Sequence, residues 1–175
     1  MKKFIGLFTV LIMSLLSMHA CRQGPPIRMA QSVNLDSFMG DWYVIAHIPT
    51  FIEQGAHNAM ESYSRKDSSV IETTFTFNKD NFNGPKKTYH PTGFVTDDPS
   101  NAEWQMQFLW PFKSEYIIVY VDPAYQFTLI GRTKRDYVWI MARKPIVSEL
   151  QMKKLIQIAV DEGYDSRKIR TIPQQ

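Results

Sequence analysis

Cysteine is nearly absent from the 175-residue chain, which contains only Cys21. A single cysteine excludes an intrachain disulfide and a cysteine-based zinc site. The four histidines show neither H-x-H nor H-x-x-x-H spacing, and no G-x-S-x-G sequence marks a serine hydrolase. An excess of charge is also missing, since the formal net charge is +3. That balance gives no indication of a nucleic-acid partner.

The remaining composition is that of one compact domain. Hydrophobic residues make up 44% of the chain and charged residues 21%, which excludes disordered and collagen-like classes. A chain of this length can bury one core but not two full ones. No internal repeat or low-complexity tract is visible.

Residues 1–20 have the three zones of a secretory signal. Lys2 and Lys3 come first, an apolar run covers 4–18, and Ala20 stands directly before Cys21. The run is too short and wrongly flanked for a stable transmembrane helix, although an uncleaved membrane anchor is the alternative. Loss of the two lysines with the signal would lower the net charge to about +1.

Residues 18–21 read Met-His-Ala-Cys and resemble the lipoprotein box Leu-Ser/Ala-Gly/Ala-Cys, with departures at the first two positions. The resemblance implies that Cys21 is lipidated, and the several acyl chains of a lipoprotein anchor it stably. Arg22, in place of aspartate, implies the outer membrane of a bacterium. Residues 21–34 contain glycine and two prolines and are predicted to tether a domain at 35–175.

Between residues 35 and 145, short runs of β-branched and aromatic residues alternate with turn clusters such as Asp97-Asp98-Pro99-Ser100. This pattern predicts an all-β fold, either an antiparallel sandwich or a barrel, and eight strands could form an up-and-down antiparallel β-barrel. Closure of the barrel would remove both sheet edges and leave room for side chains or one small ligand. We expect strands near 42–48, 58–66, 69–77, 86–95, 102–109, 115–121, 126–132 and 137–143.

One helix is predicted after the strands. Ser148 and Gln151 form a capping box, apolar residues recur at helical spacing, and Gly163 is placed to end the helix. We expect its apolar face to pack on the outside of the barrel, with a membrane-lying stripe as the alternative. Residues 168–172 predict a short ninth strand.

Several motifs resemble those of lipocalins. Gly40 and Trp42 form the G-x-W signature, Asp122 and Tyr125 stand in a T-D-x-x-Y-like turn, and Arg143 ends the eighth predicted strand. Further segments resemble the bacterial outer-membrane lipocalins: 42–46, 51–55, 111–112, 135–140, 143–145 and 162–165.

The resemblance implies a calyx that binds fatty acids or lysophospholipids while tethered to the outer membrane. It implies no enzyme activity and no cofactor, and we expect a monomer or weak homodimer. It also implies that Arg143 covers Trp42 in a cation–π contact at the closed end of the barrel. Lipocalin isomerases use a cysteine inside the barrel, where this chain has none.

Candidate ligand contacts follow from alternation. Trp104, Met106 and Phe108 share one face of their strand and are predicted to point inward. A solid core would require the same pattern, but the implied calyx favours a pocket wall. Tyr116 and Ile118 are further candidates, as are Phe75 and Phe77.

Glu61 and Tyr63 share a face of the second predicted strand with Ala59. The resemblance implies that this face points inward, whereas a slipped register would leave Glu61 in solvent. Burial would raise the pKa of its carboxyl group unless a cation pairs with it. That cation would be an internal lysine or arginine, or the ammonium group of a lysolipid.

Three functions remain open at this point. The chain is a lipid-binding carrier, a binder of haem or another hydrophobic small molecule, or an envelope lipoprotein that acts through protein interactions. Haem would need only one well-placed histidine.

Overall fold

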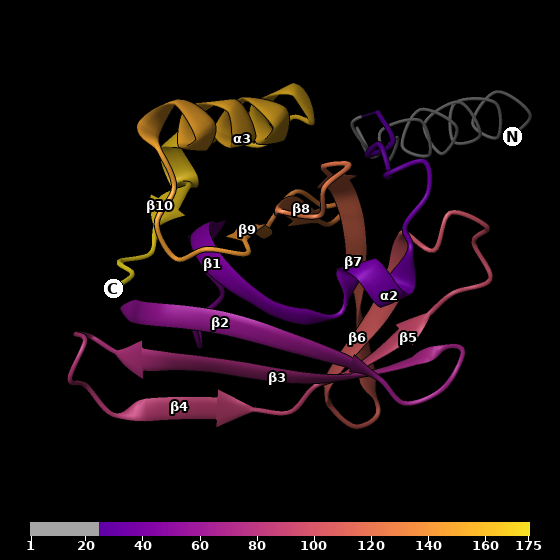
Figure 1. Cartoon of the computed structure of the whole chain (residues 1–175), viewed down its shortest axis with the longest axis horizontal. Coiled ribbons are helices and arrows are strands. Elements are labelled where there is room, and N and C mark those ends of the chain that lie inside the picture. The colour runs from indigo at the N-terminus through magenta and orange to yellow at the C-terminus, as the bar shows by residue number, and fades with distance from the viewer. Residues whose placement is uncertain (1–24) are drawn as a thin grey trace, which may run out of the picture.

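The computed structural model describes residues 25–175, so the predicted signal and Cys21 lie outside the described residues. The eight-stranded barrel is confirmed, with two additional strands and a C-terminal helix (Figure 1). The strands are β1 Gly40–Ile48, β2 Ala56–Arg65, β3 Val70–Lys79, β4 Lys86–Tyr89, β5 Thr92–Val95, β6 Glu103–Leu109, β7 Phe112–Val121, β8 Phe127–Gly131, β9 Val138–Ala142 and β10 Arg170–Thr171.

All strand pairs are antiparallel and follow the up-and-down order, and β1 pairs with β9 to close the barrel. The register places Gly40 opposite Tyr63 and Trp42 opposite Glu61. The predicted ninth strand is present as β10. It pairs with Ala46 and His47 of β1, beyond the residues of β1 that pair with β2.

The prediction of one strand over 86–95 is wrong, because the chain breaks there into β4 and β5. Pro91 lies at the break and has no N–H to donate to a strand ladder. β4 pairs with the second half of β3, and β5 pairs with both β3 and β6. Among the described strands, β4 has no second partner.

Helix α3, Glu149–Asp161, begins as predicted, since the Ser148 hydroxyl accepts a hydrogen bond from the Gln151 amide. Gly163 follows with φ of +89°, the left-handed conformation that ends many helices. A four-residue helix that the pattern did not predict, α2 Leu35–Phe38, precedes β1. No helix within residues 25–175 is long and apolar enough to cross a membrane.

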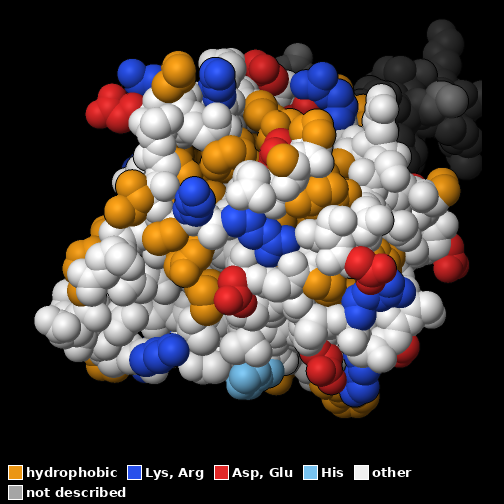
Figure 2. Space-filling model, viewed as in Figure 1, with side chains coloured by type: hydrophobic (Ala, Val, Ile, Leu, Met, Phe, Trp, Pro, Cys, Tyr) orange, Lys and Arg blue, Asp and Glu red, His pale blue; other side chains and the backbone are white. Residues whose placement is uncertain are grey.

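The alternation of side chains divides the buried residues into two layers. One layer lies inside the barrel and contains Phe38, Trp42 and Trp104. The other lies between the barrel and α3, where Ile140 and Leu129 contact the face of the helix that carries Leu155. The apolar face of α3 therefore packs on the barrel. Hydrophobic side chains also gather below α3 on the face shown in Figure 2.

The described part of the predicted tether lies against the barrel. The Ala30 amide donates to the Ile118 carbonyl at 2.9 Å, and the Val33 amide donates to Ser100 at 2.7 Å. Val33 is fully buried, and Arg28 forms an ion pair with Glu162. Residues 27–34 are thus part of the folded domain, which confines any free tether to residues before them.

Candidate ligand cavity

A cavity of about 360 Å³ lies inside the barrel, within the size range of small-molecule sites. Its mouth lies under the β1–β2 loop, at the opposite end of β1 from Gly40. Most of the walls are aromatic or aliphatic, with a few polar groups between them. The lining residues are Thr50, Phe51, Ile52, Glu53, Glu61, Tyr89, Pro91, Met106, Phe108, Ser114, Glu115, Tyr116, Arg132, Tyr137 and Trp139.

Alternation along the strands determines which predicted residues reach this cavity. On β2 the buried positions are Ala56, Ala59, Glu61 and Tyr63, and the last three alternate as expected for an inward face. Glu61, Met106 and Tyr116 line the cavity. Phe108 lines it too, but is half-exposed at the mouth, because the β6–β7 register shifts between Met106 and Leu109.

Trp104, Tyr63 and Ile118 were expected in the cavity wall, and the structure places them beneath it. None of the three lines the cavity, and all are buried in the inner core. The Trp104 ring stacks on Tyr116 at a centroid distance of 5.6 Å, and its Nε1 donates to the Asn101 carbonyl. The two additional candidates, Phe75 and Phe77, belong to the same core.

The closed end has the contact expected between Trp42 and Arg143. The Arg143 guanidinium carbon lies 3.8 Å from the centroid of the Trp42 ring. Its nitrogens also donate hydrogen bonds to carbonyl groups of Ser37, Phe38, Met39, Asp41 and Tyr125. These bonds tie helix α2 to the start of β1 and to the turn between β7 and β8.

Three further motif residues shape the chain around the contact between Trp42 and Arg143. Gly40 has φ of +90°, and a Cβ atom there would lie 3.4 Å from Nη1 of Arg143. The Asp122 carboxylate accepts hydrogen bonds from the amides of Gln126 and Phe127, which fixes the turn after β7. The Tyr125 hydroxyl in that turn accepts from the Asn34 amide. These motif residues therefore support the fold and do not line the cavity.

Glu61 is the most unusual group in the cavity, because its carboxyl is buried at the inner end. It is 6% exposed and lies one inward-facing position from Tyr63 along β2. The Tyr63 hydroxyl donates to Oε2 and also contacts the Tyr116 hydroxyl. Burial, with a smaller contribution from the negative charge of Glu53, raises the pKa of Glu61 to about 8, although the nearby Tyr116 hydroxyl opposes the rise.

Glu53, in the β1–β2 loop, is a second buried carboxyl group in the wall. Oε1 accepts from Nε1 of Trp139 at 2.6 Å, and Oε2 accepts from the Thr50 amide at 2.8 Å. Burial alone would raise the pKa of Glu53, but these donors and the adjacent His47 more than offset it, and the net pKa is lowered. Glu53 is therefore the ionised acid that repels charge on Glu61.

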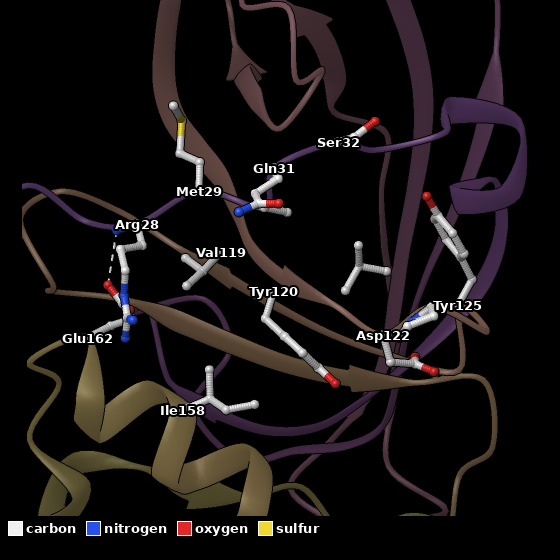
Figure 3. Close-up of a pocket in the computed structure, with 13 residues that line it drawn as sticks. Arg28, Met29, Gln31, Ser32, Val119, Tyr120, Asp122, Tyr125, Ile158 and Glu162 are labelled. Atoms are coloured by element: carbon white, nitrogen blue, oxygen red, sulfur yellow. Dashed lines mark hydrogen bonds and ion pairs between the residues drawn. The ribbon is translucent and has the colours of Figure 1, made fainter.

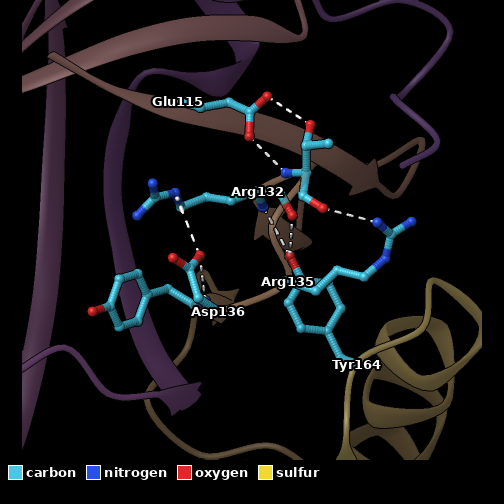
Figure 4. Close-up of polar contacts among 7 residues, drawn as sticks. Glu115, Arg132, Arg135, Asp136 and Tyr164 are labelled. Carbon is cyan, nitrogen blue, oxygen red and sulfur yellow. Dashed lines mark hydrogen bonds and ion pairs between the residues drawn. The ribbon is translucent and has the colours of Figure 1, made fainter. Parts of the chain in front are cut away.

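Arg132 is the one cation among the described residues that line the cavity. Its backbone amide donates to the Tyr164 hydroxyl, which in turn donates to the Arg132 carbonyl (Figure 4). The side chain lies 3.6 Å from Asp136 and over the Tyr137 ring. Arg132 is thus held at the mouth, away from the inner end.

The rim of the mouth exposes large apolar side chains. Phe51 is 84% exposed and Trp110 is 81% exposed. Leu109 and Phe112, beside Trp110 in the β6–β7 hairpin, are also exposed. Aromatic residues in such positions suit contact with an apolar or interfacial surface.

A second hollow lies outside the barrel, between the N-terminal segment, β7 and α3 (Figure 3). This open groove measures about 570 Å³, and the ion pair of Arg28 with Glu162 crosses one end. Its lining combines residues 28–32 with residues of β7 such as Tyr120. The internal cavity is the better candidate, because it combines apolar walls with convergent buried polar groups.

Among the cavity residues that sequence reasoning did not identify are Glu53, Trp139 and Arg132. Glu53 lies in a loop with no periodic pattern. Both faces of β9 are apolar, so alternation did not indicate that Trp139 points inward. Arg132 follows the last residue of β8, where its direction depends on the turn.

Known proteins share both the sequence pattern and the fold. Residues 33–174 match the family described as the lipocalin-like domain. The outer membrane lipoprotein Blc of Citrobacter freundii is 29% identical over 155 residues, which cover 86% of this chain and 85% of that protein. Temperature-induced lipocalin-1 of Arabidopsis thaliana is 28% identical over 156 residues, covering 85% and 83%.

Solved structures with lower identity share the architecture. Insecticyanin from the tobacco hornworm Manduca sexta superposes with a TM-score of 0.67 at 13% identity, covering 85% of this chain and 84% of the other. Lobster apocrustacyanin A1 has a TM-score of 0.65 at 11% identity, covering 86% and 91%. These two similarities concern the fold alone.

Proposed function

The chain belongs to the lipocalin family, and on that premise we propose that it binds a fatty acid or lysophospholipid in the barrel cavity and carries it in a bacterial envelope. The observation that carries the proposal is the cavity of about 360 Å³ with its predominantly apolar walls. Burial of an acyl chain there contributes about 0.8 kcal/mol per methylene group. Binding of this kind requires no catalytic group.

Membrane anchoring through Cys21 is the second part of the proposal. The lipoprotein-like box at 18–21 supports it, as do the relatives named outer membrane lipoproteins. The apolar rim around Phe51 and Trp110 suits uptake of a lipid from a membrane surface. Cys21→Ser should therefore move the folded protein from the membrane fraction to the soluble fraction. A variant that stays in the membrane pellet would refute the anchor.

The haem alternative finds no support in the cavity. Of the described residues that line it, none is histidine, so the single ligand that haem would need is not in the wall.

Ligand binding can be tested by blocking the cavity without removing a buried contact. Ser114 on β7 is exposed, lines the mouth and pairs with Met106. Ser114→Trp should weaken binding of a long-chain fatty acid and a lysophospholipid about tenfold or more in a calorimetric titration. Ser64→Trp, at an exposed position on β2, is the control. Equal affinities for wild type and both variants would place the ligand elsewhere.

A further inference from the structure

At the inner end of the cavity, one oxygen of the Glu61 carboxyl group has no hydrogen-bond partner among residues 25–175. Within the described residues, Tyr63 donates to Oε2 of Glu61, and no hydrogen bond reaches Oε1. In the other two acidic residues of the cavity wall, both carboxylate oxygens already accept hydrogen bonds. Both oxygens of Glu53 accept hydrogen bonds, and both oxygens of Glu115 accept from Thr133. An incoming ligand therefore meets one carboxyl oxygen without a hydrogen-bond partner at the inner end.

The charged groups near that oxygen do not balance one another. Glu53 is close enough to raise the proton affinity of Glu61, and Arg132 is already beside Asp136 at the mouth. A carboxylate at the inner end would be repelled by Glu53. The methyl end of an acyl chain would leave Oε1 buried without a partner, which costs about 1–3 kcal/mol. Neither end of a fatty acid brings a positive charge to this position.

A positively charged donor suits the position because it supplies the missing hydrogen bond to Glu61 in its charged form. The rings of Tyr116 and Trp139 both line the cavity and lie stacked, with centroids 6.3 Å apart and an interplanar angle of 23°. Apolar surroundings of this kind strengthen the attraction between two opposite charges.

We propose that the cavity selects single-chain amphiphiles that carry an ammonium group, which enters first and pairs with Glu61 beside Tyr116 and Trp139. The inference rests on the proposed lipid-binding function and adds the class of headgroup. In this orientation the acyl chain points towards the mouth, where Phe51, Phe108 and Trp110 provide apolar surface. Arg132 stays near the chain and makes no contact with the cation.

Binding is expected to release a proton. The groups that face Glu61 are Glu53, Tyr63 and Tyr116, and the pKa of Glu61 among them is about 8. At pH 7 the carboxyl is therefore mostly protonated, and pairing with an ammonium ion transfers the proton of Glu61 to the buffer. Close to one proton should be released per ligand bound. Affinity for the cation should rise with pH until Glu61 is ionised in the free protein.

The test compares three probes with the same alkyl chain in calorimetric titrations of the full-length protein. We expect dodecylammonium, which carries three N–H donors, to bind about tenfold to a hundredfold more tightly than dodecanol, and dodecanoate to bind no better than dodecanol. Titrations in buffers of different ionisation enthalpy should show proton release with the cation only. Equal affinities for all three probes, or no proton release with the cation, would overturn the inference.

Glu61→Gln is the matched variant, because it keeps the shape and removes the charge. It should lose the preference for the cation and the proton release, and keep its affinity for dodecanol. Glu72→Gln removes the same charge from an exposed residue paired with Lys66 and should behave as wild type. A preference retained in Glu61→Gln would contradict the assignment. The proton count on wild type tests it even if that variant does not fold.

Failure of the inference and failure of the proposed function give different results. If dodecanol and dodecanoate bind and the cation binds no better, the cavity still holds lipids and only the headgroup assignment is wrong. If no probe binds to wild type, both are wrong.

Discussion

Replacement of Glu61 by glutamine should stabilise the folded protein, and the gain should increase with pH. The carboxyl group has a pKa of about 8 in the fold and an ordinary value of 4.5 when exposed. A pKa raised on folding means that the folded state binds the proton more tightly than the unfolded state. The contribution of Glu61 to stability is fully present below pH 4.5 and is lost as the pH rises through about 8.

The size of the effect follows from the same two values. Each tenfold change in proton affinity corresponds to about 1.4 kcal/mol, so the complete loss is roughly 5 kcal/mol. Relaxation of the cavity and entry of water reduce that figure, and we expect a loss of about 2–5 kcal/mol between pH 5 and pH 9. Glutamine resembles the protonated carboxyl and carries no such dependence.

Urea unfolding of wild type and Glu61→Gln at pH 5, 7 and 9 measures the effect. Other titrating groups are common to both proteins and cancel in the difference between their free energies of unfolding. The variant should be close to wild type at pH 5 and more stable by several kcal/mol at pH 9. Parallel pH profiles would refute the argument that Glu61 is desolvated in the cavity.

Trp104→Ala should lower the free energy of unfolding by roughly 3–5 kcal/mol, because the Trp104 ring is completely buried beneath the cavity. A loss of less than about 1 kcal/mol in urea unfolding would indicate that Trp104 lines the cavity instead. Arg143→Lys should cost about 1–3 kcal/mol, because an ammonium group cannot serve five carbonyls and cover Trp42 together; an unchanged melting temperature would contradict this. Gly131→Ala should cost about 1–3 kcal/mol through overpacking, because its Cβ would lie 2.5 Å from the Tyr164 hydroxyl. Thermal unfolding equal to wild type would show that Tyr164 moves freely.

The barrel could be predicted from the sequence because its signals are local. Strands such as β6 alternate between the two faces, and turn clusters separate them at short intervals. The cap at Ser148 and the end at Gly163 similarly fixed α3 within a few residues. The break at Pro91 was missed because the flanking residues continue the strand pattern on both sides.

The site was harder to predict, because depth in the barrel is not encoded in alternation. Trp104 and Met106 share an inward face and belong to the same buried core, yet only Met106 also lines the cavity. Helix α2 accounts for the burial of Trp104, because its residue Phe38 fills the barrel interior there. The centroids of the Phe38 and Trp104 rings are 5.5 Å apart. A four-residue helix has too little periodicity to be seen in the sequence. The polar contacts of Glu53 likewise depend on a loop whose fold is set by tertiary contacts.

The most direct test of the central claim is mass spectrometry of lipid that copurifies with the protein from bacterial envelopes. The internal cavity predicts a single-chain amphiphile at close to one molecule per wild-type chain, enriched in ammonium headgroups. Ser114→Trp should lose most of that lipid, and Ser64→Trp should retain it. Lipid-free wild-type protein, or equal amounts of the same lipid on all three proteins, would contradict the claim that the cavity is the binding site.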